Sequence, residues 1–240
     1  TRLVPDSRSG SAHEWHYLDT LDELQKLGVR PVGTILAVHG NPTWSYLWRD
    51  LVSASVRAAD AGQPAWRVIA VDQLDMGFSA RTGVTRPLAQ RVRDLADFTA
   101  HHPARVPIPA PLRLAGTRGV LAASTETTSA FLNTTLRLAR PALDPAVRDA
   151  YRAPYGSAER RRGIGGFVAD IPTDARHESF AELQRIAAGV AKLTVPALLL
   201  WGPRDPIFGD RYLDDLVDRL PHADVHRFEG AGHLIAEERD

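Results

Sequence analysis

The sequence predicts an α/β fold, built on a mostly parallel sheet with helices on both faces. Three short apolar runs end in Gly or Asp, as buried parallel strands often do: residues 33–40, 66–72 and 194–202. Amphipathic segments lie between and after these runs, and parallel strands need such crossover helices. A length of 240 residues suits one ordinary domain of this kind.

The composition excludes several classes of function. The formal net charge is zero, so no general electrostatic attraction to nucleic acid or anionic membranes is expected. Without cysteine, the chain has no disulfide, no thiolate metal site and no Cys nucleophile. No apolar run approaches the roughly 18 residues of a membrane span, and the first residues lack a signal-peptide core, so the cytoplasm is the expected location. We expect no cofactor and no metal ion.

The first half of the core domain is predicted over residues 12–102. Residues 1–11 are polar and are predicted to be a linker. Alternation over residues 13–19 predicts a strand, and residues 21–31 are expected to form a loop or short turn. A helix is expected after the first apolar run, and another over residues 86–100. The apolar residues that lie on one face of the first of these helices are Trp44, Leu47, Trp48, Leu51 and Val52.

The second half begins differently, with four prolines within residues 101–111 that exclude a central strand. Residues 103–177 are predicted to form a helical cap, because short helix-like pieces follow one another there without a strand between them. Those pieces lie near residues 117–123, 128–140, 144–153 and 157–170. The core is predicted to resume over residues 178–240. Besides the apolar strand, its expected elements are helices at 178–193 and 210–220 and a strand at 223–230.

Asn41 directly follows the first apolar strand, at the edge where open parallel sheets bind their ligands. Pro42 has no N–H, so a backbone donor at this corner belongs to Asn41, whose side-chain amide offers another. Such donors suit an oxyanion hole. A strand-to-helix turn with Pro at the helix start explains the same residues equally well.

Asp205 and His233 follow two successive strands of the second half. Each residue alone has a structural explanation, since Asp favours turns and an isolated His is more often structural. Together they form a more specific pattern, because a His held by a carboxylate through Nδ1 can act as a general base through Nε2. The order acid then base is that of the α/β-hydrolase triad.

Several other polar features are interpreted as structural. His101 and His102 are adjacent in a Pro-rich loop and have no further ligand at a suitable spacing. His39 is expected to bond within its turn, and Ser79 lacks a G-x-S-x-G frame. The arginines at 160–162 are expected to form a solvated helix face.

Together these segments resemble the α/β-hydrolase superfamily, in particular its haloalkane-dehalogenase-like branch. The likeness spans about residues 13–240 and rests on the stretches HGNPTWSYLWRDLV, VIAVDQLDMGFSART, AYRAPY, LLLWGPRDPIF and GAGHLIAEE. ERRRGIGGFVADIP and DRYLDDLVDRLPHADVHRFEGAGH are most similar to the β-lactone decarboxylases of bacterial long-chain olefin biosynthesis. In actinobacteria such enzymes are often fused to a β-lactone synthetase domain of the acyl-CoA-ligase type, so the resemblance implies a fused or associated synthetase.

The nucleophile of this branch is missing from the sequence. By resemblance it is an Asp in a sharp strand-to-helix turn of the form G-H-D-W-G, and neither G-x-D-x-G nor G-x-S-x-G occurs in the chain. The helix ending at Ala100 runs straight into His101, where the family has a strand, the nucleophile elbow, a helix and a strand. We therefore predict that a block of about 40 residues is absent between Ala100 and His101, by comparison with the strand, helix and strand lengths usual in such units.

The absence of that block has a physical cost. Two missing strands leave a gap of roughly 14 Å between the strands over 33–40 and 194–202, at about 4.8 Å per strand. Buried N–H and C=O groups on both sides lose their partners, at about 1–3 kcal/mol each. We therefore expect that the natural protein contains the block and that Ala100 and His101 lie far apart; the ordinary trans-peptide spacing of about 3.8 Å would indicate a true deletion.

The resemblance implies an enzyme that converts a cis-β-lactone with long alkyl chains into a cis-alkene and CO₂. Asp205 and His233 are the implied acid and base, and Asn41 holds an oxygen of the substrate. A small hydrophobic substrate implies an apolar pocket under the cap, with these candidate lining residues: Trp44, Phe131, Leu132, Tyr151, Tyr155 and Phe167. Haloalkane dehalogenase and epoxide hydrolase remain alternatives, as does a non-catalytic module that binds a lipid or a partner.

Overall fold

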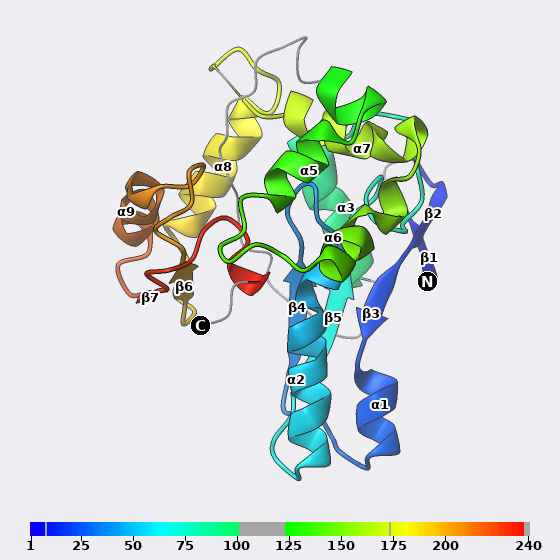
Figure 1. Cartoon of the computed structure of the whole chain (residues 1–240), viewed down its shortest axis with the longest axis vertical. Helices are drawn as coiled ribbons and strands as arrows, with labels where there is room; N and C mark the ends of the chain where they lie inside the picture. The colour runs from blue at the N-terminus through cyan, green and yellow to red at the C-terminus, as the bar shows by residue number, and fades with distance from the viewer. Residues whose placement is uncertain (8, 101–122, 173, 238–240) are drawn as a thin grey trace.

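The fold is seen in a computed structural model, which describes residues 1–7, 9–100, 123–172 and 174–237 (Figure 1). The strands are β1 (Arg2–Pro5), β2 (Ala12–Trp15), β3 (Tyr17–Asp19), β4 (Thr34–Val38), β5 (Arg67–Val71), β6 (Leu198–Trp201) and β7 (Asp224–Arg227). The α-helices are α1 (Leu21–Lys26), α2 (Arg49–Asp60), α3 (Leu88–Ala100), α5 (Ala130–Leu136), α6 (Pro145–Arg152), α7 (Ala158–Ala169), α8 (Phe180–Val190) and α9 (Asp210–Arg219). Shorter turns are η1 (Ser45–Trp48), η2 (Ala123–Thr127), η3 (Ala153–Tyr155) and η4 (Ile235–Glu237).

Strand β5 is the centre of a three-stranded sheet. It pairs antiparallel with β3 and parallel with β4, with Ile69 opposite Leu36. All five residues of β5 are buried, which explains why the sequence there is a continuous apolar run rather than an alternating one. The carboxyl end of β5 leads to Asp72, which is completely buried.

Strands β6 and β7 form a separate parallel pair, in which Leu199 lies opposite Val225. Figure 1 shows this pair beside the three-stranded sheet, with α8 and α9 next to it. Among the described residues, β4 and β6 each have a partner on one side alone. Leu198 is 61% exposed and Leu200 is 50% exposed, so the side chains of β6 that face away from Leu199 are uncovered.

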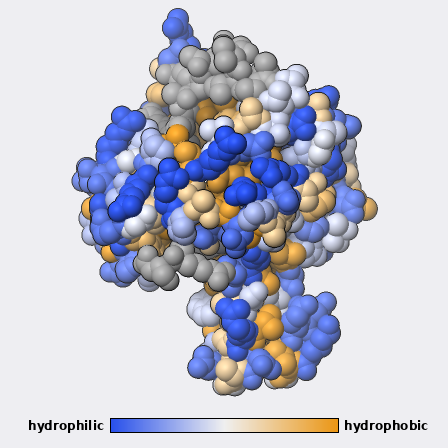
Figure 2. Space-filling model, in the orientation of Figure 1, coloured by the Kyte–Doolittle hydropathy of each residue, from blue (hydrophilic) through white to orange (hydrophobic). Residues whose placement is uncertain are grey.

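The described part of the predicted cap is helical. Helices α5, α6 and α7 pack over the ends of β4 and β5 in Figure 1. Gly163 permits the close approach of α7 to the core, because a Cβ there would lie 2.0 Å from the backbone oxygen of Asp75. Figure 2 shows apolar side chains in the middle of this face, framed by hydrophilic ones. The helix expected near residues 117–123 lies largely outside the described residues.

Two expectations for the N-terminal region were wrong. Residues 1–11 contain β1, which pairs antiparallel with β2 and buries Val4 against Trp15 and Phe98, so this segment belongs to the packed structure and is not a free linker. Residues 21–26 form helix α1 rather than a loop. Leu24 is fully buried there, because one apolar side chain at the right position is enough to dock a helix of two turns.

The strand expected over residues 13–19 is divided at His16 into β2 and β3, which belong to different sheets. The other described elements follow the sequence pattern within a few residues. Helix α3 is described as far as Ala100, and His101 lies outside the described residues, so the end of this helix and the distance between the two residues stay untested. None of the described helices combines the length and apolarity needed to cross a lipid bilayer.

Candidate active site

Asp205 and His233 meet in space although 28 positions separate them in the sequence. His233 Nδ1 lies 2.9 Å from Asp205 Oδ2, and both side chains are largely buried. The Ile207 N–H donates to the other carboxylate oxygen at 2.7 Å, which fixes the orientation of the carboxylate. Phe208 stacks on the His233 ring with 5.7 Å between centroids, so the imidazole is held on its face as well as at Nδ1.

The loops that carry this pair are joined through their backbones. The Arg204 N–H donates to the Ala231 carbonyl at 2.9 Å. A Cβ at Gly202 would lie 2.5 Å from the Gly232 oxygen, so only glycine allows the two loops to come this close. The strand pair β6–β7 thus positions the two side chains through its carboxyl-end loops.

The electrostatics of Asp205 favour its ionised form. Burial acts to raise the pKa of Asp205, but the hydrogen bonds from His233 and from the Ile207 amide outweigh it and leave the pKa below the usual carboxyl value. A carboxylate that stays charged can stabilise a proton on His233 and fix its tautomer with Nε2 free to accept.

Asn41 lies at the carboxyl end of β4 and faces the cap. Its Nδ2 donates to the Ile164 carbonyl of α7 at 3.3 Å, and its buried Oδ1 has no hydrogen-bond partner among the described residues. The amide is therefore held by one long hydrogen bond, which a substrate oxygen could replace. The turn expected as the structural alternative is present, since the Thr43 N–H and Oγ1 both donate to the Gly40 carbonyl, but Pro42 does not start a helix, because η1 begins at Ser45.

The candidate pocket residues come together, but they form packed core. One buried cluster contains Trp44, Leu132, Tyr151 and Tyr155 together with Leu234, the neighbour of His233. Phe131 and Phe167 pack against its outside. This cluster therefore joins the loop of Asn41, the cap and the loop of His233.

Both cap tyrosines use their hydroxyls within the protein. Tyr155 OH donates to the Thr43 carbonyl and accepts from the Gly77 N–H, each at 3.1 Å. Tyr151 OH donates to Glu237, which also forms an ion pair with Arg49. Burial, together with the neighbouring carboxylate, raises the pKa of Tyr151 far above its usual value. These tyrosines fasten the cap to the core.

Sequence reasoning missed two of the polar clusters around the site. Arg49, Tyr151 and Glu237 meet from α2, the cap and η4, with no common spacing in the sequence that could reveal them. His16 Nδ1 lies 2.9 Å from Asp72 Oδ2, whose carboxylate also accepts from the Ser45 and Phe78 amides. For the second cluster the sequence offered one signal, which is Asp72 at the end of the apolar run over residues 66–72.

The polar residues that were interpreted as structural can be compared with their contacts in the structure. His39 accepts from the Gln73 N–H through Nε2 and contacts the Gly40 carbonyl through Nδ1, and burial lowers its pKa, so it serves its turn as a neutral ring. Ser79 Oγ donates to the Asp72 carbonyl, as a turn residue would. His101 and His102 lie outside the described residues. The described part of the chain has no group of three or more potential ligands placed to hold a metal.

The arginine run was interpreted wrongly in part. Arg160 donates to the carbonyls of Pro154 and Gly77, and Arg161 donates to the carbonyl of Tyr155. These guanidinium groups cap backbone carbonyls at the contact between α7 and the rest of the protein. Arg162 alone of the three matches the expected exposed helix face.

A family model described as alpha/beta hydrolase fold matches residues 112–240, more than half of the chain. The chain belongs to this family. It is 28% identical over 251 positions to a cis-3-alkyl-4-alkyloxetan-2-one decarboxylase of Shewanella oneidensis, covering 85% of the chain and 77% of that protein. The decarboxylase of the same name from Xanthomonas campestris is 25% identical over 257 positions, covering 85% of the chain and 83% of that protein.

Haloalkane dehalogenases are also similar. One from Mycolicibacterium paratuberculosis is 26% identical over 293 positions, covering 98% of the chain and 93% of that protein. The dehalogenase DatA of Agrobacterium tumefaciens has the same fold with a TM-score of 0.77 at 16% identity, over 98% of this chain and 90% of DatA. The 293 aligned positions exceed the 240 residues of the chain, so at least 53 positions of the Mycolicibacterium protein face no residue here.

Proposed function

We propose that the chain is an α/β-hydrolase-fold enzyme of the β-lactone decarboxylase type, which converts a cis-β-lactone with long alkyl chains into a cis-alkene and CO₂. The observation that carries this proposal is the Asp205–His233 pair, placed beside the apolar cluster where the cap meets the core. The likeness to two proteins named as decarboxylases of alkyl-substituted oxetanones supports the choice of substrate class.

The proposed roles follow from the geometry. Asp205 holds Nδ1 of His233, so that Nε2 can serve as a base or assist turnover of a covalent intermediate. The Asn41 amide stabilises a developing negative charge on the lactone oxygen. The apolar cluster loosens or re-packs to take up the alkyl chains, which pack against aliphatic and aromatic side chains.

The overall reaction is balanced without a cofactor. The four-membered ring loses its carboxyl unit as CO₂ when one C–O bond and one C–C bond break, and the two remaining ring carbons form the double bond. The proposed nucleophile is an Asp carboxylate that is not among the 240 residues, carried by the absent block between Ala100 and His101. Support comes from the 53 or more unmatched positions of a relative and from β4 and β6, each of which lacks a strand on one side within the described residues.

The decisive experiment compares two proteins. The first is the chain as it stands, and the second carries the block of the Shewanella relative inserted between Ala100 and His101. Each is incubated with a synthetic cis-β-lactone, a long-chain haloalkane and an epoxide, and alkene, halide and diol are measured by mass spectrometry and ion chromatography. We expect alkene and CO₂ from the lactone with the inserted block, and no turnover with the chain alone.

The other outcomes separate the alternatives. Halide release without alkene favours a haloalkane dehalogenase, an alternative that is supported by the similarity to known dehalogenases. Diol formation favours an epoxide hydrolase. Binding of the lactone by the chain alone, with no turnover by either protein, favours a non-catalytic lipid-binding module. Full activity of His233→Ala in the active protein would contradict the role given to the Asp205–His233 pair.

A further inference from the structure

A small cavity lies between helix α7 of the cap and the core, away from the Asp205–His233 pair. Its volume is about 90 Å³, which is room for several water molecules. The core contributes the loop that follows β5 and the start of α3, and the cap contributes α7. The lining residues that carry charge are Asp75, Arg81, Arg86, Arg91, Glu159 and Arg162.

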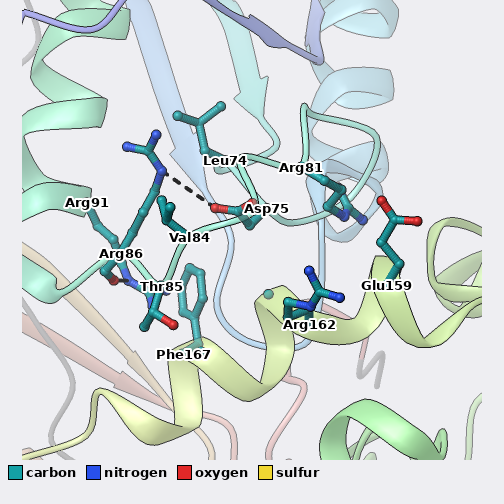
Figure 3. A pocket seen from close by; sticks show the side chains of 13 residues that line it. Leu74, Asp75, Arg81, Val84, Thr85, Arg86, Arg91, Glu159, Arg162 and Phe167 are labelled. Carbon is teal, nitrogen blue, oxygen red and sulfur yellow. Dashed lines mark hydrogen bonds and ion pairs between the residues drawn. The ribbon is translucent and has the colours of Figure 1, made fainter. Parts of the chain in front are cut away.

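Figure 3 shows how these side chains are distributed around Phe167. Arg81, Arg162 and Glu159 lie on one side of it, and Arg86 and Arg91 lie on the other. Four arginines and two carboxylates therefore line the same cavity. The question is which of these charges the protein already neutralises.

Arg86 is neutralised. Its guanidinium lies 2.8 Å from Asp94 Oδ1, 3.5 Å from Asp75 Oδ2 and 3.8 Å from Asp6 Oδ2. Asp75 in turn accepts from the N–H and the hydroxyl of Thr82. This part of the cavity is a closed network of charges and has no need of a ligand.

Arg81 has hydrogen-bond partners but no counter-charge in direct contact. Its five N–H groups donate to the carbonyls of Met76, Gly77, Ser79 and Arg160, and it forms no ion pair among the described residues. Burial and the nearby charge of Arg160 lower the pKa of Arg81. Arg81 is half-buried, and the charges of Asp75 and Asp72 act on it without direct contact, so an anion in the cavity would stabilise it by charge rather than by new hydrogen bonds.

Arg91 is only partly satisfied. Its Nε donates to the Arg86 carbonyl at 2.6 Å, and the nearest carboxylate oxygen, on Asp170, lies 3.9 Å away. Its Nη1 is buried and has no hydrogen-bond partner among the described residues. The guanidinium lies 3.3 Å from the centre of the Phe167 ring, and burial lowers the pKa of Arg91 to about 10.

Arg162 and Glu159 complete the lining from α7. Both side chains are exposed, and neither has a hydrogen bond or ion pair with the described residues. Each can therefore be changed without breaking a contact inside the protein. They offer opposite charges at the same cavity, which makes them a matched pair for a test.

We propose that this cavity binds a small oxyanion, the phosphate or carboxylate group of a ligand, between the cap and the core. Arg91, whose Nη1 lacks a partner among the described residues, and exposed Arg162 can donate to such a group, and Arg81 adds positive charge beside them. Guanidinium groups are the preferred partners of phosphate and carboxylate, because their planar forks match two oxygens at once. A bound oxyanion would join α7 to the core and so stabilise the docking of the cap.

The test uses inorganic phosphate as the probe. The chain is titrated with sodium phosphate by isothermal calorimetry at constant ionic strength, with sodium chloride as the balancing salt. We expect saturable binding, which Arg162→Gln weakens by about tenfold, the effect of losing one charge-assisted hydrogen bond. Glu159→Gln should strengthen binding by about threefold, because it removes a repelling charge from a partly solvated site.

The control is Arg30→Gln, which removes an exposed arginine that lies outside the cavity and has no hydrogen bond or ion pair among the described residues, and it should leave the affinity unchanged. A second titration with sodium acetate distinguishes a carboxylate ligand from a phosphate ligand. Binding of either probe that responds in opposite directions to the Arg162 and Glu159 variants supports the proposal. No saturable binding of either probe, or binding that responds equally to the Arg30 variant, overturns it and makes the arginines a purely structural contact between cap and core.

Discussion

Strands β5 and β6 have similar apolar sequences and very different surroundings. Strand β5, RVIAV, has a neighbour on each side, and all its residues are buried. Strand β6, LLLW, has one neighbour among the described residues, and Leu198 and Leu200 are at least half exposed. An apolar run thus indicates that a strand can be buried. The elements beside the strand in space determine whether it is buried.

The same contrast separates the two His–Asp pairs. Asp72 sits behind β5, is completely buried and accepts hydrogen bonds from His16 and two backbone amides. Asp205 sits behind β6 and is less enclosed, with its carboxylate held by His233 and the Ile207 amide. The pairs differ in their carboxylates, since the Asp72 side chain is 0% exposed and that of Asp205 is 8% exposed, whereas the order of the histidines is reversed, with His16 24% exposed and His233 15% exposed.

The largest expected effect concerns the two strands directly. Ile69→Ala removes a side chain that is 2% exposed and should cost about 2–5 kcal/mol of unfolding free energy, through lost burial and a cavity. Leu198→Ala changes a side chain that is 61% exposed and should stay within about 0.5 kcal/mol. Urea unfolding followed by circular dichroism measures both. An equal cost for the two changes would show that β6 is covered in solution.

The pH dependence of folding stability provides a second comparison, between the carboxylates of Asp72 and Asp205. Burial opposes ionisation of Asp72, but the hydrogen bonds and charges of its neighbours outweigh it and leave its pKa low, as for Asp205. A lowered folded-state pKa contributes stability above the unfolded value of about 3.9, and this stability is lost as the pH falls through the folded value. Asp72→Asn should therefore cost about 1–3 kcal/mol at pH 7, with the difference from the parent shrinking below about pH 4.

The matched variant in the other region is Asp205→Asn. It should lose less unfolding free energy at pH 7 than Asp72→Asn, and its difference from the parent should likewise shrink as the pH falls. Urea midpoints measured between pH 7 and pH 3 give both curves. A constant difference from the parent across this range would mean that neither ionised carboxylate contributes to folding.

A smaller effect is expected where the cap is fastened to the core. Tyr151→Phe removes the hydroxyl that donates to buried Glu237 and should cost about 1–2 kcal/mol. Tyr212→Phe is the control, because the Tyr212 hydroxyl contacts only the exposed Arg211 side chain in the described structure. Thermal unfolding of the two variants measures the difference. Equal midpoints would mean that Glu237 is held by Arg49 alone.

The pattern of apolar runs was sufficient for most elements, because burial of a strand or a helix face leaves a regular spacing. It failed at β1 and α1, where a single buried residue, Val4 or Leu24, docks a polar segment and leaves no periodic signal. The Asp205–His233 pair could be expected since parallel strands bring their carboxyl-end loops to one edge. Arg49 and Glu237, 188 positions apart, could not be expected, because no repeat or spacing connects them.

By itself, the sequence determined the α/β class, the helical character of the described cap segments, the meeting of Asp205 and His233, and the lack of a recognisable nucleophile elbow. These follow from local composition, spacing and order, which are written along the chain. Tertiary structure alone decided that most of the candidate pocket residues pack into a buried cluster and that arginines converge on a cavity beneath α7. It also decided that, in the part of the chain that the structure describes, β4 and β6 each have a strand on one side alone. The reason is that packing and charge compensation depend on neighbours in space, and those neighbours come from segments that are distant in the sequence.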